Sequence, residues 1–261
     1  MCIRDRPYIT APMEAEAQCA QLSIQHLVDG IITDDSDVFL FGGSPVYRHM
    51  FNHRQSVECY WMSDMERELG LSRTRLIQLA FLLGSDYTEG LTGVGPVLAM
   101  EILSLYPGDH ALESFRDWWR EVQMGHDTMP RSKVRARIQR ALRDKLHLSS
   151  DWPDVYEREA YVAPHVDDSD EPFVWGHADL DAIRAFLHEY LHWPASKTDQ
   201  YVLPVLEQQR KTARLQRVQA TLDQAGFVGG RVPHKATSFT STRLQHAVEQ
   251  FRASKRPRPS T

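Results

Sequence analysis

Carboxylate side chains gather at the ends of predicted strands and helices in the first third of the chain. Two stand at a helix start, three follow an apolar strand, and one comes just past a helix: Glu14 and Glu16; Asp34, Asp35 and Asp37; Asp86. Because sites in open α/β sheets form outside the carboxyl ends of the strands, we expect acids at these positions to face one site. Oxygen-only ligands suit hard cations, Mg²⁺ or Mn²⁺, rather than zinc. Two such ions, roughly 3.5–4 Å apart, can activate a water and stabilise the leaving oxygen of a phosphodiester.

Each acid also has a plainer interpretation as a charge that stabilises a helix. A negative charge in the first turn is favoured by the helix dipole, and for Glu14 or Glu16 alone this alternative stays open. Residues i and i+2 of a regular helix point about 200° apart. Glu14 and Glu16 can therefore share a site only if the first turn is irregular, or if they serve different ions or waters. The pair Asp35 and Asp37, directly after an apolar strand, favours the metal site.

A glycine-rich loop joins two predicted helices just after Asp86. It places Gly90, Gly93 and Gly95 within the segment LLGSDYTEGLTGVGPVLAMEIL. Glycine permits positive φ and close approach of a partner to the backbone, and the free N–H groups at the start of the second helix suit a phosphate. The loop from Gly90 through Val94 to Gly95 therefore predicts a clamp on a DNA backbone. An ordinary glycine-rich turn between two helices is the alternative.

The elements that must position these residues begin as alternating strands and helices. Strand patterns stand at 7–12, at 31–33 with a restart at Val38, and in the stretches 45–51 and 56–62. Ser63 and Ser72 are expected to cap helices that end at Gly70 and Gly84. This order predicts an α/β fold with a partly parallel sheet. From residue 84 the pattern is helical, with helices expected over 96–106, 111–123, 132–147, 179–193 and 197–220.

The motifs resemble the internal nuclease region of the XPG and flap-endonuclease superfamily. The resemblance rests on APMEAEAQCA, GIITDDSDVFLFGG, LLGSDYTEGLTGVGP and AMEIL, followed by VDDSDEPFVWGHADLDAIRAFL and WPASKTD, and it covers roughly residues 7 to 210. The sequence around Met13 is more similar to the XPG branch, which acts in nucleotide-excision repair. The flap endonucleases are the second possibility. A non-catalytic module that binds DNA or a partner is a third hypothesis.

The resemblance implies a role for each matched position. Glu14, Glu16, Asp35, Asp37 and Asp86 would be the catalytic metal ligands, direct or through water, for two Mg²⁺ ions with Mn²⁺ as an alternative. Gly90, Gly93, Val94 and Gly95 would form a helix–turn–helix clamp on duplex DNA, helped by a monovalent cation such as K⁺. Incision would occur near a junction of double- and single-stranded DNA, in the nucleus, with other repair factors as partners. No role is implied for Asp34.

The resemblance, together with the Gly-, Ser-, Thr-, Pro-rich and basic composition of the end of the chain, predicts four segments. These are a partial PIN/FEN-like α/β nuclease core with a mostly parallel sheet over 1–83, a helix-hairpin-helix-type DNA clamp with further helices over 84–147, a C-terminal helical wrap over 148–225, and a disordered basic tail over 226–261. Family members also carry an N-terminal nuclease half with further metal-binding aspartates. We expect this chain, in which that half does not precede the internal region, to be catalytically incompetent alone.

Two other patterns compete with the nuclease interpretation. HEYLH, from His188 to His192, matches the H-E-x-x-H zinc-hydrolase pattern, with Glu189 as base and Glu207 as a loosely placed third ligand. Pro194 soon ends that helix, and apolar residues already define its buried face, which favours a structural role. A basic run lies on one expected helix and suits either a DNA backbone or a solvated face: Arg131, Lys133, Arg135, Arg137, Arg140, Arg143 and Lys145.

The composition limits how this chain could bind DNA. Its net charge of −5 over 261 residues excludes a generally basic coat, so nucleic-acid binding must use local patches. The three cysteines, Cys2, Cys19 and Cys59, suit neither a zinc knuckle nor a disulfide framework, which predicts a reducing compartment. No apolar run approaches the ~20 residues of a membrane span. SKRPRP near the C-terminus is a candidate nuclear localisation signal.

Overall fold

A computed structural model describes residues 2–3, 6–51, 57–126, 132–174, 176, 178–223, 239 and 241–254. The chain forms two compact units. The larger unit comprises Ala11–Asp170 with Thr237–Thr261, and the smaller one comprises Met1–Thr10 with Glu171–Ala236. This division differs from the four predicted segments, because the expected core and clamp lie together in the larger unit.

The larger unit contains a three-stranded sheet in the order β3 (Ile31–Ile32), β4 (Val46–Arg48) and β5 (Glu58–Tyr60). β3 runs parallel to β4, with Ile31 opposite Val46, whereas β4 pairs antiparallel with β5. Ile31 and Val46 point into a small apolar cluster with Val38 and Phe39. The predicted α/β class is confirmed, but among the described strands the sheet is mixed rather than mostly parallel.

Two expected strands take other conformations. The stretch from Val38 forms a short 3-10 helix, η1 (Asp37–Phe39), because Asp35 Oδ1 accepts a hydrogen bond from Asp37 N at 2.9 Å and turns the chain. Of the pattern at 7–12, only Pro7 lies in a strand, β2 (Arg6–Pro7), which pairs with β1 (Cys2–Ile3) in the smaller unit. The residues before α1 (Ala15–Ile24) therefore reach that helix without strand structure.

α2 (Met62–Leu69) and α3 (Arg73–Leu83) follow the sheet close to the predicted bounds. Gly70 ends α2 in the left-handed conformation at φ +75°, as its position predicted. The serines do not cap as expected. Trp61 precedes the first residue of α2, and Ser72, although it is the N-cap of α3, makes no side-chain capping bond.

The main hydrophobic core lies among α3 and the helices that follow it. These are α4 (Pro96–Leu105), α5 (Ala111–Gln123), α6 (Lys133–Leu142) and α7 (Val155–Val162). Its fully buried members include Phe81, Ile102, Phe115, Trp119 and Tyr161. α7 lies between the helices expected over 132–147 and 179–193, and the side chain of Asp154 caps it by accepting from Tyr156 N and Glu157 N.

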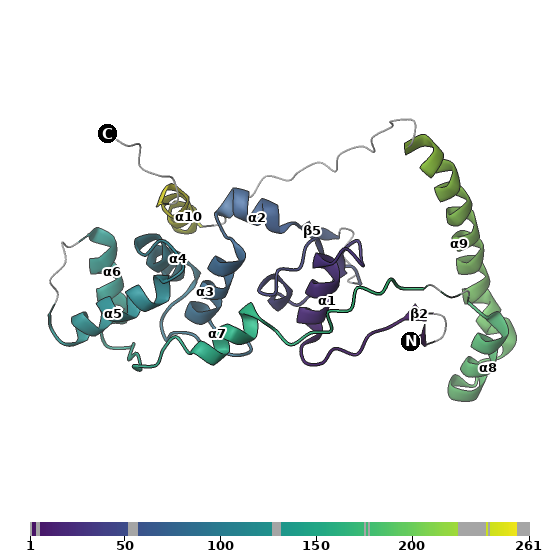
Figure 1. Ribbon diagram of the computed structural model, residues 1–261, viewed down its shortest axis with the longest axis horizontal. Helices are drawn as coiled ribbons and strands as arrows, with labels where there is room; N and C mark the ends of the chain where they lie inside the picture. The colour runs from purple at the N-terminus through teal and green to yellow at the C-terminus, as the bar shows by residue number, and fades with distance from the viewer. Residues whose placement is uncertain are drawn as a thin grey trace. The chain divides into compact units, whose positions relative to one another are not determined.

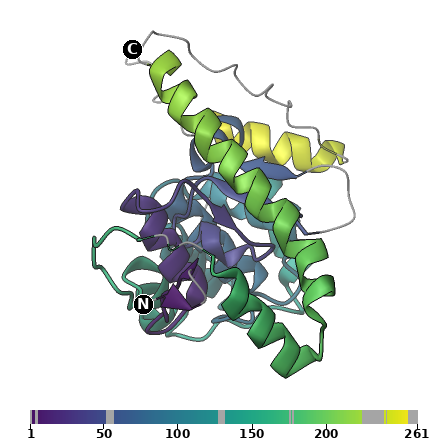
Figure 2. The ribbon, with the colours of Figure 1, turned by 90° about the vertical axis from the view of Figure 1, so that its right-hand side faces the viewer.

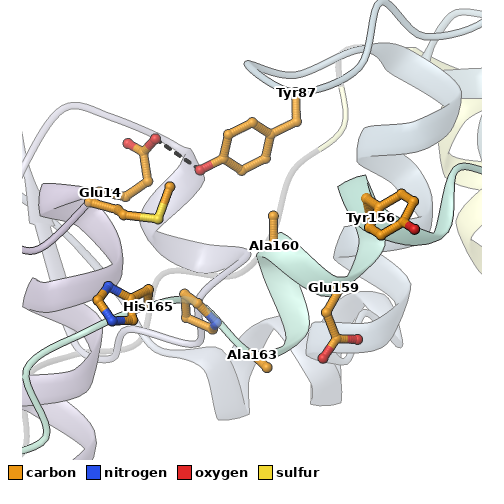
Figure 3. A pocket seen from close by; sticks show the side chains of 9 residues that line it. Glu14, Tyr87, Tyr156, Glu159, Ala160, Ala163 and His165 are labelled. Carbon is orange, nitrogen blue, oxygen red and sulfur yellow. Dashed lines mark hydrogen bonds between the residues drawn. The ribbon is translucent and has the colours of Figure 1, made fainter.

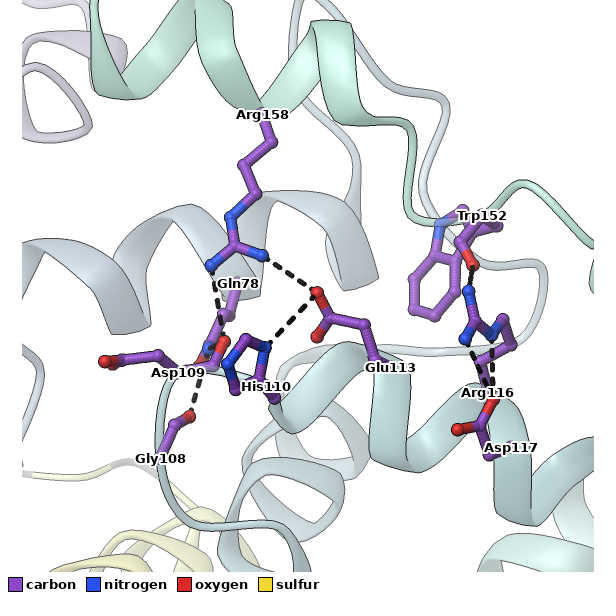
Figure 4. Close-up of polar contacts among 9 residues, drawn as sticks. All are labelled: Gln78, Gly108, Asp109, His110, Glu113, Arg116, Asp117, Trp152 and Arg158. Atoms are coloured by element: carbon purple, nitrogen blue, oxygen red, sulfur yellow. Dashed lines mark hydrogen bonds and ion pairs between the residues drawn. The ribbon is translucent and has the colours of Figure 1, made fainter.

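Polar contacts fasten α7 and the segment before it to α5 (Figure 4). Arg158 donates to Glu113 Oε1 at 2.9 Å, and Arg116 donates to the carbonyl of Trp152 at 3.3 Å. Gln78 of α3 donates to the carbonyl oxygens of Gly108 and Asp109, just before α5. These contacts fix the position of α7, which borders the candidate site.

The end of the larger unit corrects the prediction of a disordered tail over 226–261. Residues 242–254 form α10 (Thr242–Ser254), which packs against α4 and α2 (Figure 1). Ala247, Val248 and Phe251 are buried at this contact, and the Arg75 guanidinium lies 5.3 Å from the centre of the Phe251 ring. Three apolar side chains at helical spacing hold the segment although its composition is mainly polar. SKRPRP begins at Ser254, and its remaining residues lie outside the described part of the chain.

The smaller unit is built on α8 (Leu180–Leu191) and α9 (Ala195–Asp223), which pack against each other (Figure 2). Arg184 donates to both carboxylate oxygens of Asp199 at 2.7 and 2.8 Å across this contact. Trp193 and Tyr201 add a ring contact at 5.7 Å between centroids. Within the described residues, no helix has the length and apolar character needed to cross a membrane.

Candidate active site

A side-chain turn at the end of β3 positions Asp35 and Asp37. Thr33 Oγ1 accepts from Asp35 N at 3.0 Å, and Asp35 Oδ1 accepts from Asp37 N at 2.9 Å. Asp34, which lies between Thr33 and Asp35, contacts the neighbouring strand: its Oδ1 accepts from His49 N at 2.7 Å, and its carbonyl accepts from Arg48. The turn therefore separates one structural acid from the two acids placed at the carboxyl end of the strand.

Asp37 lies among the other candidate acids. Its pKa is raised above the ordinary value because burial disfavours the charged form and because the carboxylates of Asp86, Asp35 and Glu16 repel it. A hydrogen bond from the backbone of Asp86 acts in the opposite direction. Acids from the β3 turn, the loop after α3 and the start of α1 thus share one electrostatic neighbourhood.

The two glutamates lie on different kinds of backbone. Glu14 precedes α1 in an extended conformation, φ −78° and ψ 130°, and Glu16 belongs to the first helical turn. Glu14 Oε1 accepts a hydrogen bond from Tyr87 Oη at 2.8 Å (Figure 3). Glu16 instead acts on Asp37 and also contributes to the raised pKa of the Cys19 thiol. The irregular start that a shared site required is present, and the two carboxylates have different neighbours.

Two tyrosines absent from the predicted site support these acids. Tyr87 directly follows Asp86, and its ring lies 4.9 Å from that of Tyr161 of α7. Tyr161 Oη donates to Ser85 Oγ at 2.7 Å, which fixes the residue before Asp86. Burial and the bond to Glu14 raise the pKa of the Tyr87 phenol, so it stays a proton donor at neutral pH. The only sequence signal for this role was the position of Tyr87 beside a predicted ligand.

A pocket of about 250 Å³ opens beside Glu14 (Figure 3). Met13, Glu14 and Tyr87 line it, together with residues of α7 and the chain after it, including Tyr156 and His165. The pocket is mostly apolar apart from the carboxylates and the imidazole. It provides space next to a candidate ligand, bounded by aromatic rings.

The glycine loop divides into a structural part and an open part. Gly90 has φ +73°, and a Cβ there would stand 2.4 Å from Gly84 N, so only glycine fits. Gly93, at φ +86°, lies against the Lys145 side chain. Gly95 begins α4 with nothing within 4 Å of a Cβ, no side-chain cap and no acid in the first turn. Gly95 and the exposed side of Gly93 are therefore the parts a partner can approach, while Val94 is half-buried and bonds to Leu91.

The donor chemistry of the acids fits a hard cation, since all five candidates are carboxylates. The uncompensated negative charge around Asp37 is what a bound cation would neutralise. However, the described residues contain no group of three or more His, Cys, Asp or Glu side chains arranged to hold an ion. The carboxylates lie near one another, but the described ones do not converge on a single position that an ion could occupy.

The HEYLH pattern does not form the predicted zinc face. His192 ends α8 in the left-handed conformation at φ +53°, so it leaves the helical register that would align it with His188. The His188 ring lies 3.3 Å from the carbonyl oxygen of Trp193. No metal-holding group including Glu189 or Glu207 occurs among the described residues. The geometry of His188 and His192 therefore does not support the zinc alternative.

Comparison with known proteins places these motifs among DNA repair nucleases. The XPG I-region family model matches residues 6–86. The DNA repair protein rad13 of Schizosaccharomyces pombe is 46% identical over 252 residues, which are 94% of this chain and 22% of rad13. The mouse DNA excision repair protein ERCC-5 is 42% identical over 93% of this chain and 20% of its own length. The chain thus spans about a fifth of the length of these two relatives.

Solved structures agree with the sequence matches. The catalytic core of Rad2 superposes with a TM-score of 0.70 at 45% identity, over 77% of this chain and 68% of that one, and Rad2 has also been solved with DNA substrate. The more distant junction-resolving enzyme GEN1 shares the fold at 21–22% identity and a TM-score of 0.54. Its structures include one with Mg²⁺ and product DNA and one with potassium.

Proposed function

The chain belongs to the XPG family, and from this premise we propose that it is the internal nuclease region of a metal-dependent, structure-specific DNA endonuclease of nucleotide-excision repair. The observation that carries the proposal is the shared neighbourhood of Asp37, Asp86, Asp35 and Glu16, built from three separate elements. Enzymes of this class act on junctions between double- and single-stranded DNA. The proposal includes action on nuclear DNA, and therefore a nuclear location, with DNA-repair factors as partners.

In this proposal Asp35, Asp37, Asp86, Glu14 and Glu16 hold two Mg²⁺ ions or Mn²⁺, directly or through water. The bound ions would supply a nucleophilic hydroxide and stabilise the leaving oxygen of the cleaved phosphodiester. The residues of the chain do the positioning. The β3 turn orients Asp35 and Asp37, and Tyr87 orients the Glu14 carboxylate through a hydrogen bond.

In this proposal the glycine loop binds duplex DNA. The uncapped start of α4 leaves N–H groups free for a phosphate, and Gly95 lets a DNA backbone approach without a side chain in the way. Contacts of this kind position the duplex without reading its sequence. A monovalent cation such as K⁺ at the loop would add to the same contact.

We propose that the chain alone incises DNA weakly or not at all. The described acids do not form a group that could hold an ion, so further ligands or a rearrangement on DNA must complete the site. The same observation favours a second candidate function, a DNA-binding module without turnover. The two candidates differ only in whether incision can be restored.

A reconstitution experiment separates them. The chain is mixed with Mg²⁺ and a labelled bubble or flap substrate, with and without the N-terminal nuclease segment of a family member added in trans. We expect incision at the junction only in the reconstituted mixture, and its loss in Asp37→Asn. Binding without restored incision would favour the DNA-binding module, and robust incision by the chain alone would refute incompetence in isolation. Failure to bind junction DNA would refute both functions.

A further inference from the structure

α6 and the turn after it form the most basic stretch of the described chain. Between Lys133 and Lys145 the sequence KVRARIQRALRDK contains six cations and one acid, Asp144, in a chain whose net charge is −5. No acid lies within the helix itself, so the i, i+3 and i, i+4 ion pairs that usually balance a solvated helix face cannot form there. This excess of positive charge therefore needs another explanation.

Two of the six cations are held by the protein. The Arg135 guanidinium lies 5.5 Å from the ring centres of both Tyr106 and Trp118. Arg137 forms a salt bridge of 2.9 Å to Glu101, whose side chain is only 3% exposed. Both contacts act within the fold, so these two arginines are assigned structural roles.

The other four cations point to solvent: Lys133, Arg140, Arg143 and Lys145. Among the described residues none of them forms an ion pair with a carboxylate. Lys133 and Arg140 are seven residues apart and so lie on the same side of α6, away from the buried Ile138 and Leu142. The helix thus has one face in the core and one face that carries unneutralised positive charge.

Lys145 joins this face to the glycine loop. Its Cδ lies 3.4 Å from the position of a Cβ at Gly93, so the aliphatic part of Lys145 rests against the turn. Two residues further along the chain, Gly95 opens α4 with free space around it. The charged face and the open part of the loop are therefore adjacent and come from chain segments about fifty residues apart.

We infer that Lys133, Arg140, Arg143 and Lys145 extend the glycine loop into a phosphate-binding surface for the backbone of duplex DNA. The inference rests on the proposed function and adds to it the residues that hold the duplex. Four cations with flexible side chains match a polyanion through charge and not through base recognition, so binding is independent of sequence. Arg135 and Arg137, although part of the same basic run, do not take part.

Equilibrium binding without divalent metal tests this surface independently of catalysis. The full chain and its Arg140→Ala and Lys145→Ala variants are titrated with two fluorescent duplexes of unrelated sequence over a series of KCl concentrations. Each lost phosphate contact is expected to lower the slope of log affinity against log salt by about 0.9. We expect that decrease, with weaker binding to both duplexes, and restored binding in Arg140→Lys.

Arg252→Ala is the matched control, because Arg252 is an exposed cation on α10 in the same unit. It should leave affinity and slope unchanged. Equal effects of Arg252→Ala and Lys145→Ala, or no effect of the α6 variants on a chain that binds DNA, would overturn the inference while leaving the proposed function intact. Equal competition by polyglutamate would assign the face to acidic proteins and also overturn it. If the wild-type chain binds no duplex, the proposed function fails together with the surface.

Discussion

Tyr87 Oη donates a 2.8 Å hydrogen bond to Glu14 Oε1 and so joins two residues 73 positions apart in the chain. Tyr87 stands beside Asp86 in the loop after α3, while Glu14 precedes α1. The bond therefore couples two of the proposed metal-ligand segments. Tyr161, whose ring lies 4.9 Å from that of Tyr87 at an interplanar angle of 56° and whose hydroxyl donates to Ser85, extends this coupling to α7.

Tyr87→Phe is expected to weaken metal binding more than it weakens the fold. The ring contact with Tyr161 is kept, and the loss of one hydrogen bond to a half-exposed carboxylate changes stability by about 0.5–1.5 kcal/mol. The Glu14 carboxylate, no longer oriented, should bind Mg²⁺ less tightly. Calorimetric titration of the DNA complex with Mg²⁺ measures this change, and Tyr156→Phe, which alters an exposed tyrosine of the same pocket, is the control. Unchanged affinity would contradict a positioning role for Tyr87.

Asp37→Asn is expected to stabilise the protein at neutral pH in the absence of divalent ions. Burial and neighbouring carboxylates raise the pKa of Asp37 above 3.8, so the folded state binds this proton more tightly than the unfolded state. The stability that this proton contributes is fully present below pH 3.8 and is lost as the pH rises through the folded pKa. The variant should therefore have a higher Tm than wild type at pH 7, and the difference should disappear near pH 3.

In the reconstituted mixture with junction DNA and the N-terminal nuclease segment, where the proposed site is complete, added Mg²⁺ should reverse the order, because it stabilises only a complex whose acids can bind it. Asp34→Asn is the control for this experiment. Asp34 orients the end of β4 through His49 and lies outside the acidic neighbourhood, so its variant should show neither the gain at pH 7 nor an altered response to Mg²⁺. A lower Tm for Asp37→Asn in metal-free buffer at pH 7 would contradict the electrostatic account.

The sequence alone identified most of what local chemistry determines. The caps at Gly70 and Gly84, the strands β3 to β5 and the helices α3 to α6 follow from hydrophobic spacing and turn residues, and the structure has them close to the predicted places. The acids were found because they stand at strand and helix ends. Family resemblance then added the order of the motifs, which a single acid or glycine could not supply.

The remaining features depend on contacts between distant segments. Tyr87 and Glu14 meet only in the folded chain, and nothing in their local sequence marks the bond. The segment of α10 was predicted to be disordered because its composition is polar. In the structure Ala247, Val248 and Phe251 are buried where α10 packs against α4. The basic run likewise appeared uniform, although Arg137 is bound to a buried carboxylate and Arg140 is not.

Phe251→Ala is expected to destabilise the larger unit by about 3–5 kcal/mol, the usual effect of emptying a fully buried aromatic site. The loss follows from the packing of α10 on the core formed by α4. Urea unfolding followed by tryptophan fluorescence measures it, since Trp118 and Trp119 lie in the same core. The neighbouring exposed residue provides the control: Gln250→Ala should change stability by less than about 0.5 kcal/mol. Equal stability of both variants would mean that α10 does not belong to the folded unit.

Gly90→Ala and Gly95→Ala should separate the structural part of the glycine loop from the part that meets DNA. At Gly90 the new Cβ would stand 2.4 Å from Gly84 N with φ at +73°, so backbone must move, and positive φ alone adds about 1–3 kcal/mol of strain. Gly95 has φ −105° and open space, so alanine fits there and the chain should fold with nearly unchanged Tm. A methyl group at Gly95 should nevertheless hinder a phosphate at the start of α4 and weaken duplex binding severalfold. Duplex affinity and Tm are measured on both variants. We expect Gly90→Ala to be unfolded, and Gly95→Ala to be folded but to bind duplex DNA weakly. Full DNA affinity in Gly95→Ala would show that this residue is not part of the proposed clamp.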